Sequence, residues 1–486
     1  MDTGLGTADD PLRTLAAALD RPSVRRVRVG PGRHELDELS IFRPLEIQGV
    51  RGATLAGSLF IGASDTHLSD LTLEGALRVG LADGVRLARS TLQSPDAEVA
   101  LAAVSASLEL EEVRVEGGVR AAIQATSSTI TLESSAVSGP RAERGLWVLG
   151  GRARVSNTRL RDLAGPAIEA TEGSTVSVSG AHIGPSRGGG VTATDGAVVE
   201  LVDSEVRDVG EPALLVRRAI GRTRSSTLAG AGRALAVLGG QATVRGSLLQ
   251  ATRWAALTAE AFADTPPQVT LVGSCLAHGD VDGARVTAGR LEARETRFFG
   301  ASRCARTSTA SAPAKERAAL RITGPDAKVR LRESEIDGPR GSGVVLEDDA
   351  ELELIDSSVL RAGGDGVRIA HVRAGRAHLE GLRISSCAGA ALRVVDSADV
   401  RVERLEASGC AEGGVLAGDE SLLDLARSEL AGPGPLLGGW RGSSLLVQSS
   451  TVGHARPWSV FVSCSDGSQL VDEGDNRIDG PAFACP

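Results

Sequence analysis

Apolar and polar residues alternate over short stretches along most of the chain. Two examples are residues 198–201 (VVEL) and 351–354 (ELEL). This two-residue rhythm is typical of β-strands, whereas an amphipathic helix repeats its apolar positions every three to four residues. Gly, Ser and Asp residues that favour turns separate the stretches. We therefore predict an all-β protein built from many short strands.

A longer period lies over this rhythm. The segment GGGVTATDGAVVELVDSEVRDVG (188–210) parallels the segment GSGVVLEDDAELELIDSSVLRAG (341–363). We mark each repeat by the first apolar residue of its opening strand. Neighbouring markers are 21 to 25 residues apart, except for two steps of 29 and 34 residues between Leu257 and Leu320. The markers are Leu77, Leu101, Ile123, Leu146, Ile168, Val191, Leu214, Leu235, Leu257, Val286, Leu320, Val344, Val367, Leu392, Val415, Leu437, Val460 and Phe483.

A repeat of about 23 residues has room for three short strands and three turns, which make one coil of a parallel β-helix. In that fold, side chains of equal phase on neighbouring coils stack about 4.8 Å apart. A leucine-rich repeat has a similar length, but the helical return half that it needs is missing from the sequence. The composition suits a narrow interior, because 42% of the residues are hydrophobic and only 2% are aromatic.

Small polar residues recur at one position of the repeat. We expect them to form a ladder at a turn, because a hydroxyl group can both donate to and accept from turn backbone. A row of nucleophiles is the less favoured interpretation. The residues are Ser90, Ser135, Ser204, Ser226, Ser247, Ser274, Ser334, Ser357, Ser428 and Ser450, with Asn157 and Asn476 in the same place.

The N-terminal segment 6–20 predicts a short amphipathic helix. Asp10 would be its N-cap and Pro11 its first helical residue. Its apolar face would consist of Leu12, Leu15, Ala16 and Leu19. The strand-like sequence VRRVRVGPGRHELDELSIFRPLEIQGVRGATLAG follows.

This order of helix, strand, Pro-Gly turn and strand pair resembles the start of right-handed parallel β-helix proteins of the pectate-lyase-like superfamily. The resemblance implies a right-handed solenoid of about 20 coils whose open end is covered by the helix. We expect the cap and first coils in residues 1–57 and the β-helix in residues 58–486. A lateral loop is expected around residues 303–318, where the sequence is rich in Ser, Thr, Ala and Pro.

Charge and hydropathy exclude two classes of partner. The chain has 62 acidic and 53 basic residues, a formal charge of −9, which disfavours nucleic acid. Its sequence contains no apolar run long enough to cross a bilayer. The N-terminus has no signal-like segment, and we expect an export leader to have been removed before Asp2.

Six cysteines lie late in the chain, at intervals of about one coil. The spacings predict three disulfides between neighbouring coils, Cys275 with Cys304, Cys387 with Cys410, and Cys464 with Cys485. The alternative is buried free thiols. Disulfides would place the protein outside the cytoplasm. The spacings do not match a zinc site, and no metal or cofactor is expected.

The outward positions of the opening strand provide one candidate binding site. The residue after each marker points outward, which gives Arg321, Val345, Arg368 and Arg393 on four consecutive coils, with Glu347 further along the strand. Guanidinium groups at this spacing could pair with the carboxylates of an anionic polysaccharide. A solvated face with Glu347 as counter-charge is the alternative.

A second candidate is the polar cluster His278, Asp280, Asp282 and Arg285 in the segment LAHGDVDGAR. These residues could form an acid/base or metal-binding group, or simply a solvated turn beside Cys275.

The function that these observations favour is non-catalytic. The resemblance implies catalytic motifs that this chain lacks, including the paired-Asp and His-Gly segments of polygalacturonase-like hydrolases, and the chain contains no Tyr. We expect an exported or cell-surface bacterial protein that binds a glycan or an envelope component, such as an envelope protein, along its outer face. The alternative is a polysaccharide lyase or glycoside hydrolase that acts on an anionic polysaccharide.

Overall fold

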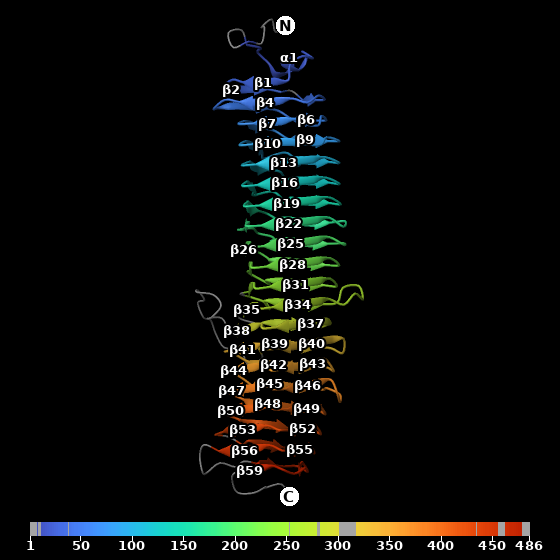
Figure 1. Cartoon of the computed structure of the whole chain (residues 1–486), viewed down its shortest axis with the longest axis vertical. Helices are drawn as coiled ribbons and strands as arrows, with labels where there is room; N and C mark the ends of the chain where they lie inside the picture. Colours follow the sequence, from blue (N-terminus) through green and yellow to red (C-terminus); the bar gives the residue numbers. More distant parts are fainter. Residues whose placement is uncertain are drawn as a thin grey trace. The chain divides into compact units, whose positions relative to one another are not determined.

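The structure is a computed structural model that describes residues 7, 11–36, 38–251, 253–278, 282–300, 317–433, 435–454 and 462–478. It divides into two compact units, Met1–Gly230 (unit 1) and Ala231–Pro486 (unit 2). Each unit is a parallel β-helix in which every coil contributes one strand to each of three sheets, A, B and C, in that order along the chain. Figure 1 shows the strands of sheet A following one another within each unit.

In unit 1 the strands are shorter near the N-terminus. Sheet A contains β1 (Arg26–Val29), β4 (Glu46–Gly49), β7 (His67–Ser69), β10 (Val85–Ala88), β13 (Ser107–Glu111), β16 (Thr129–Glu133), β19 (Arg152–Ser156), β22 (Thr175–Ser179), β25 (Val198–Val202) and β28 (Ile220–Arg224). Sheet B contains β2 (Gly32–Glu35), β5 (Ala53–Ala56), β8 (Thr72–Glu74), β11 (Thr91–Ser94), β14 (Arg114–Gly117), β17 (Ala136–Gly139), β20 (Arg159–Leu163), β23 (His182–Ile183), β26 (Glu205–Val209) and β29 (Thr227–Gly230). Sheet C contains β3 (Leu39–Ile41), β6 (Leu59–Ile61), β9 (Leu77–Gly80), β12 (Val99–Val104), β15 (Ala121–Thr126), β18 (Leu146–Leu149), β21 (Ile168–Thr171), β24 (Val191–Thr194) and β27 (Leu214–Arg217).

Unit 2 repeats the same arrangement. Sheet A contains β31 (Gln241–Arg245), β34 (Gln268–Val272), β37 (Gly289–Arg294), β40 (Ala327–Arg332), β43 (Glu351–Ile355), β46 (Ala377–Glu380), β49 (Asp399–Glu403), β52 (Leu422–Ala426), β55 (Ser444–Gln448) and β58 (Gln469–Asp472). Sheet B contains β32 (Leu248–Ala251), β35 (Cys275–His278), β38 (Arg297–Gly300), β41 (Glu335–Asp337), β44 (Ser358–Leu360), β47 (Arg383–Ser385), β50 (Glu406–Ser408), β53 (Glu429–Gly432), β56 (Thr451–His454) and β59 (Arg477–Ile478). Sheet C contains β30 (Leu235–Leu238), β33 (Leu257–Glu260), β36 (Ala284–Val286), β39 (Ala318–Thr323), β42 (Ser342–Glu347), β45 (Val367–Ala370), β48 (Ala390–Val395), β51 (Gly413–Ala417), β54 (Leu437–Gly439) and β57 (Val462–Cys464).

The predicted parallel β-helix is confirmed. The chain makes about 18 coils with a period of about 23 residues, close to the number expected, and contains almost no helix. Marker residues pair in register from coil to coil, for example Leu77 with Leu101 and Leu101 with Ile123. Their side chains are buried. The interior is therefore a set of stacked aliphatic columns, which leaves little room for aromatic rings.

The predicted polar ladder lies at the corner between sheets A and B. Thr158, and not the predicted Asn157, takes the ladder place of its coil, because its hydroxyl accepts from the N–H of Ser135 (3.4 Å). The hydroxyl of Ser204 donates to the carbonyl of Val202 (2.8 Å) and accepts from the backbone N–H of Ala181 one coil earlier (3.2 Å). The N–H of Ser204 donates in turn to the hydroxyl of Ser226 (3.1 Å). Each hydroxyl thus satisfies backbone groups of two coils, as expected for turn satisfaction rather than catalysis.

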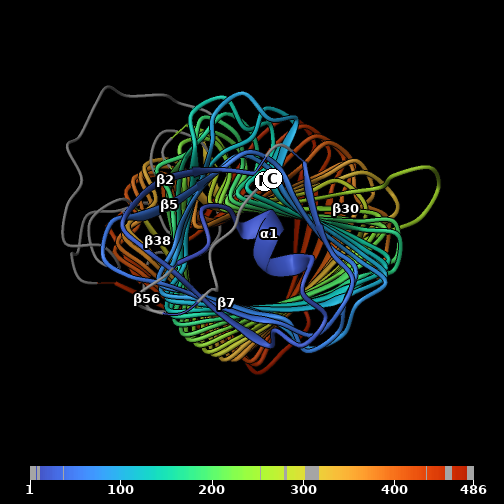
Figure 2. The ribbon, with the colours of Figure 1, turned by 90° about the horizontal axis from the view of Figure 1, so that it is seen from above.

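The N-terminal helix is present but shorter than predicted. Helix α1 runs from Leu15 to Leu19, and its N-cap is Thr14, whose hydroxyl accepts from the N–H of Ala17 (3.2 Å). The predicted start at Pro11 is therefore wrong, because Thr14 provides the cap one turn later; Asp10 lies outside the described residues. The buried residues are Leu15 and Ala18, whereas Ala16 is exposed. In Figure 2, α1 lies over the space enclosed by the first strands of unit 1.

Candidate functional site

The outer face of sheet C in unit 2 carries the predicted arginines. Five outward residues stack in register over five consecutive coils: Arg285, Arg321, Val345, Arg368 and Arg393. They lie on β36, β39, β42, β45 and β48. Strands of one sheet are about 4.8 Å apart, so this column, which we call the arginine face, is about 19 Å long. Val345 is only 4% exposed, so its neighbours on the face cover it.

Two marker assignments from the sequence were wrong. Leu437 pairs with Val462, so Val462 is the marker in place of Val460. The other correction enlarges the site. Leu257 pairs with Ala284 and Ala284 pairs with Leu320, so the marker of this coil is Ala284 instead of Val286. Arg285 consequently lies beside Arg321 on the arginine face. The sequence did not indicate this, because a small alanine occupies the marker position and the larger Val286 follows two residues later.

Asp282 holds Arg321 from the corner that precedes β36. One oxygen of the Asp282 carboxylate accepts from the backbone N–H of Ala318 (2.9 Å), and the other lies 3.1 Å from Nε of Arg321. Nη1 of Arg321 also lies 3.2 Å from the carboxylate of Glu347. Asp282 is buried, and both of its oxygens contact groups of the protein. Arg321 is therefore a positioned cation with two counter-charges.

Asp365 holds Arg393 in the same way. Its Oδ1 accepts from the N–H of Ala390 (2.9 Å), and its Oδ2 lies 3.0 Å from Nε of Arg393. Arg393 also contacts the carboxylate of Glu412. Burial alone would lower the pKa of Arg393, but the hydrogen bonds and negative charges of Asp365 and Glu412 raise it overall. Arg393 is fixed in position and in charge.

Arg285 and Arg368 differ from these two residues. Both side chains are exposed, and neither forms an ion pair with any residue that the structure describes. Among the residues predicted for substrate binding, the structure therefore joins Arg321 to Glu347 and places Arg368 next to Arg393. The site itself remains a prediction.

The second predicted cluster does not form as a unit in the described part of the chain. Arg285 belongs to the arginine face, and Asp282 holds Arg321 of that face. His278 ends β35 in sheet B, and Asp280 lies outside the described residues. Within the described residues, no group of three or more His, Cys, Asp and Glu side chains could hold a metal ion.

The cysteines contradict one of the three predicted pairs and leave the other two untested. Cys275 and Cys464 are disulfide-bonded; their expected partners, Cys304 and Cys485, lie outside the described residues. Cys387 and Cys410 are buried free thiols, so the predicted bridge between them is wrong.

Equal phase on neighbouring coils places two Cα atoms about 4.8 Å apart, which a disulfide tolerates, so phase alone does not decide whether the bond forms. The N–H of Cys387 instead donates to Sγ of Cys410 (3.4 Å), the arrangement that the serine ladder uses. A side-chain hydrogen bond with Cys410, together with burial, raises the pKa of the Cys387 thiol, and the same hydrogen bond lowers the pKa of Cys410.

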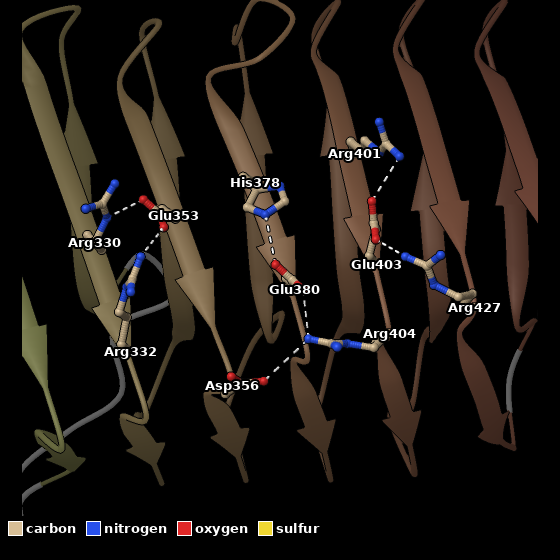
Figure 3. A network of polar contacts seen from close by, with 10 residues as sticks. All are labelled: Arg330, Arg332, Glu353, Asp356, His378, Glu380, Arg401, Glu403, Arg404 and Arg427. Carbon is tan, nitrogen blue, oxygen red and sulfur yellow. Dashed lines mark hydrogen bonds and ion pairs between the residues drawn. The ribbon is translucent and has the colours of Figure 1, made fainter.

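The outer face of sheet A in unit 2 is also charged, but its charges neutralise one another (Figure 3). Glu353 meets Arg330 and Arg332, and Glu403 meets Arg401 and Arg427. Figure 3 also shows Glu380 between His378 and Arg404. Every carboxylate drawn there has a cationic partner, so this face offers a ligand little uncompensated charge.

Trp147, an outward aromatic residue of sheet C in unit 1, is covered. The guanidinium carbons of Arg120 and Arg144 lie 4.8 and 4.5 Å from its ring centroid. The side chain is 8% exposed. It stabilises two cations rather than offering a platform on which a sugar ring could stack.

No helix among the described residues is long and apolar enough to cross a membrane.

No protein-family model matches the chain, and no curated protein matches it. The Dettilon tailspike protein matches with a TM-score of 0.38 and 9% identity, over 58% of this chain and 61% of the tailspike chain, so this chain spans less than two thirds of that protein. The PL6 family alginate lyase AlyGC matches with a TM-score of 0.32 and 8% identity, over 95% of this chain and 98% of the lyase. PfbA, a surface adhesin of Streptococcus pneumoniae, matches with a TM-score of 0.31 and 9% identity, over 73% of this chain and 88% of the adhesin. At these values the comparisons carry no argument about activity. The chain is a parallel β-solenoid, and its structural neighbours are pectate-lyase-like β-helix proteins.

Proposed function

We propose that this protein is an exported or cell-surface, non-catalytic β-helix protein that binds an anionic glycan of the cell envelope. The observation that carries the proposal is the arginine face, where four guanidinium groups lie in one column over five coils. Guanidinium groups form paired, charge-assisted hydrogen bonds with carboxylates and sulfates. A straight column of such groups suits a linear, repeating anion.

The carboxylates of this face favour binding over catalysis. Asp282 and Asp365 are buried and bonded on both oxygens, and Glu347 is paired with Arg321. A general acid or base must be able to exchange a proton with the substrate, and these carboxylates are committed to arginines and backbone. The disulfides of Cys275 and Cys464 support an oxidising compartment.

The test is binding of purified protein to polygalacturonate, alginate and a neutral glucan in low-salt buffer, measured by isothermal titration calorimetry. We expect binding to the two polyuronates only, with an affinity that falls as salt is added. Arg368→Ala combined with Arg393→Ala should weaken it by at least about tenfold.

The matched control is Arg78→Ala, compared with Arg368→Ala alone, since Arg78 is an exposed outward residue of sheet C in unit 1 and each substitution removes one positive charge. Absence of polyuronate binding, or an equal effect of Arg78→Ala, would contradict the proposal. An assay for cleaved product run in parallel tests the lyase or hydrolase alternative. If the protein cleaves the glycan and Glu347→Gln abolishes the cleavage, the protein is an enzyme and the non-catalytic proposal is wrong.

A further inference from the structure

The arginine face contains the same two-coil motif twice. Residues 282–286 read DGARV and residues 365–369 read DGVRI; the coils that follow them open with AALRI (318–322) and AALRV (390–394). The hydrogen bonds are repeated as well. In each copy the aspartate bonds the first alanine N–H of the following coil at 2.9 Å and the arginine of that coil at 3.0 to 3.1 Å. Chance similarity of neighbouring coils does not account for this, because the intervening coil (342–347, SGVVLE) lacks both the aspartate and the arginine.

In each copy one arginine forms no ion pair with a described residue. In the first copy, Arg321 has Asp282 and Glu347 as counter-charges. In the second, Arg393 has Asp365 and Glu412. The remaining arginine of each copy, Arg285 or Arg368, is exposed and unpaired among the described residues.

The second carboxylates are not part of the repeat. Glu347 comes two residues after the outward position of its coil, whereas Glu412 precedes β51. The two copies therefore share the aspartate and both arginines but are neutralised from different sides. Each copy therefore keeps an arginine that is fixed by an aspartate, next to an arginine that forms no ion pair with a described residue.

The two free guanidinium groups lie on coils three strand steps apart, through the register pairs Arg285 with Arg321, Arg321 with Val345, and Val345 with Arg368. Three steps correspond to about 14 Å along the stacking direction. We propose that the copies are two equivalent anion subsites that hold one linear anionic polysaccharide along the coil axis, with Arg285 and Arg368 as ligand contacts. Arg321 and Arg393 act as positioning residues that hold the floor of each subsite. This inference rests on the proposed function. It adds the number of anion subsites and the direction in which the polysaccharide lies.

A polysaccharide fits this lining better than an acidic peptide does. The exposed or half-exposed carboxylates of Glu347 and Glu412 flank the guanidinium groups. They would accept hydrogen bonds from hydroxyl groups, which a polyuronate carries on every ring and the side chains of an acidic peptide lack. A pyranose ring is about as long as one strand spacing, so the chain advances about one ring per coil and meets both arginines about three rings apart.

The experiment measures the affinity of oligogalacturonates of increasing length by calorimetry at low salt. Binding to two linked subsites makes the second contact intramolecular, so the affinity should rise by at least about tenfold once the oligomer spans both arginines, at about four rings. Arg285→Ala and Arg368→Ala should each remove this rise to the same extent, and the double variant should lose little more of it. Arg78→Ala, the exposed sheet C arginine of unit 1, is the matched control and should leave the rise intact.

The outcomes separate this inference from the proposed function. If polyuronate binds but its affinity does not depend on length, or if Arg285→Ala acts no more strongly than Arg78→Ala, the paired subsites are wrong while glycan binding stands. If no polyuronate binds, both fail. If poly-L-glutamate binds with the same length dependence and the same sensitivity to Arg285→Ala, the face recognises an acidic peptide instead of a polysaccharide.

Discussion

Oδ2 of Asp365 lies 3.0 Å from Nε of Arg393, which belongs to the next coil of the β-helix. The side chains are 10% and 20% exposed, so this is one of the better shielded ion pairs of unit 2. The same carboxylate also accepts a backbone N–H of the coil that carries the arginine. One side chain thus fixes both the start of β48 and the direction of the cation that projects from it.

Replacing Asp365 should therefore reduce stability measurably. Asp365→Asn can keep the acceptor for Ala390 but loses the charge that faces Arg393. We expect the free energy of unfolding, measured by urea titration, to fall by about 1–3 kcal/mol. The control is Asp424→Asn, whose carboxylate lies 3.8 Å from Arg401 and is 38% exposed; it should change stability by less than about 1 kcal/mol. Equal effects of both variants would show that the Asp365 contact has no special weight.

The serine ladder makes a similar prediction for unit 1. Ser204→Ala removes the acceptor of the buried Ala181 N–H, which is then left without a partner. An unsatisfied buried donor costs about 1–3 kcal/mol of unfolding free energy. Ser179→Ala, an exposed position at the end of β22, should have an effect below about 0.5 kcal/mol. Thermal and urea unfolding followed by circular dichroism compare the two variants, and a neutral Ser204→Ala would contradict the role assigned to the ladder.

Thiol titration tests the state of the cysteines. The chain has six cysteines, of which Cys387 and Cys410 are free and buried. Protein denatured without reductant should yield two titratable thiols per chain, and none in the double variant Cys387→Ser, Cys410→Ser. The folded protein should react slowly, because both sulfurs are buried. Six thiols without reductant would show that the disulfides of Cys275 and Cys464 do not form.

Acid should weaken the contact between Asp70 and Arg89. The hydrogen bond from Arg89 lowers the pKa of Asp70 below its ordinary value. A carboxylate with a lowered pKa in the folded state contributes stability above its unfolded pKa of about 4, and this contribution is lost as the pH falls through the folded value. Asp70→Asn should therefore destabilise the protein at pH 7 by up to about 1 kcal/mol and by less at pH 3, since the pair is partly exposed.

Asp203→Asn is the matched control for this effect. Asp203, like Asp70, adopts a left-handed backbone conformation that asparagine tolerates, with φ of 47° and 59°, but it forms no ion pair with a described residue. Its effect on unfolding in urea should not change between pH 3 and pH 7. A similar pH dependence for both variants would argue against the role of Arg89.

The sequence was sufficient to predict the parallel β-helix. The alternation of apolar and polar residues and the period of about 23 residues recur along the chain, so a wrong assignment in one coil does not affect the others. Leu101 and Ile123 could be aligned from spacing alone. The ends of elements were harder to predict. Thr14 is the N-cap and Ala284 is the marker of its coil, but neighbouring small residues fit the same sequence pattern, so the pattern does not identify them.

The candidate site was predicted in outline only. The column containing Arg321, Arg368 and Arg393 follows from phase. That Asp282 and Asp365 hold two of the arginines did not follow, because these aspartates lie in corners whose backbone path is not periodic. The disulfide between Cys387 and Cys410 was predicted wrongly for a related reason. The spacing shows that the two residues have equal phase, but it does not show that the N–H of Cys387 donates to Sγ of Cys410 in place of a disulfide.

The corner ladder also has a consequence for how such a chain can evolve. A ladder hydroxyl such as that of Ser204 bonds the coil before it, so coils that carry the ladder residue present the same donors and acceptors to their neighbours. A block of whole coils can therefore be inserted by gene duplication without leaving a mismatched seam, whereas an insertion of part of a coil would shift every side chain to a different phase. The repeated DG and AALR segments, three coils apart, have the form that such a duplication would leave. The length of the arginine face would then be a trait that changes in steps of about 14 Å.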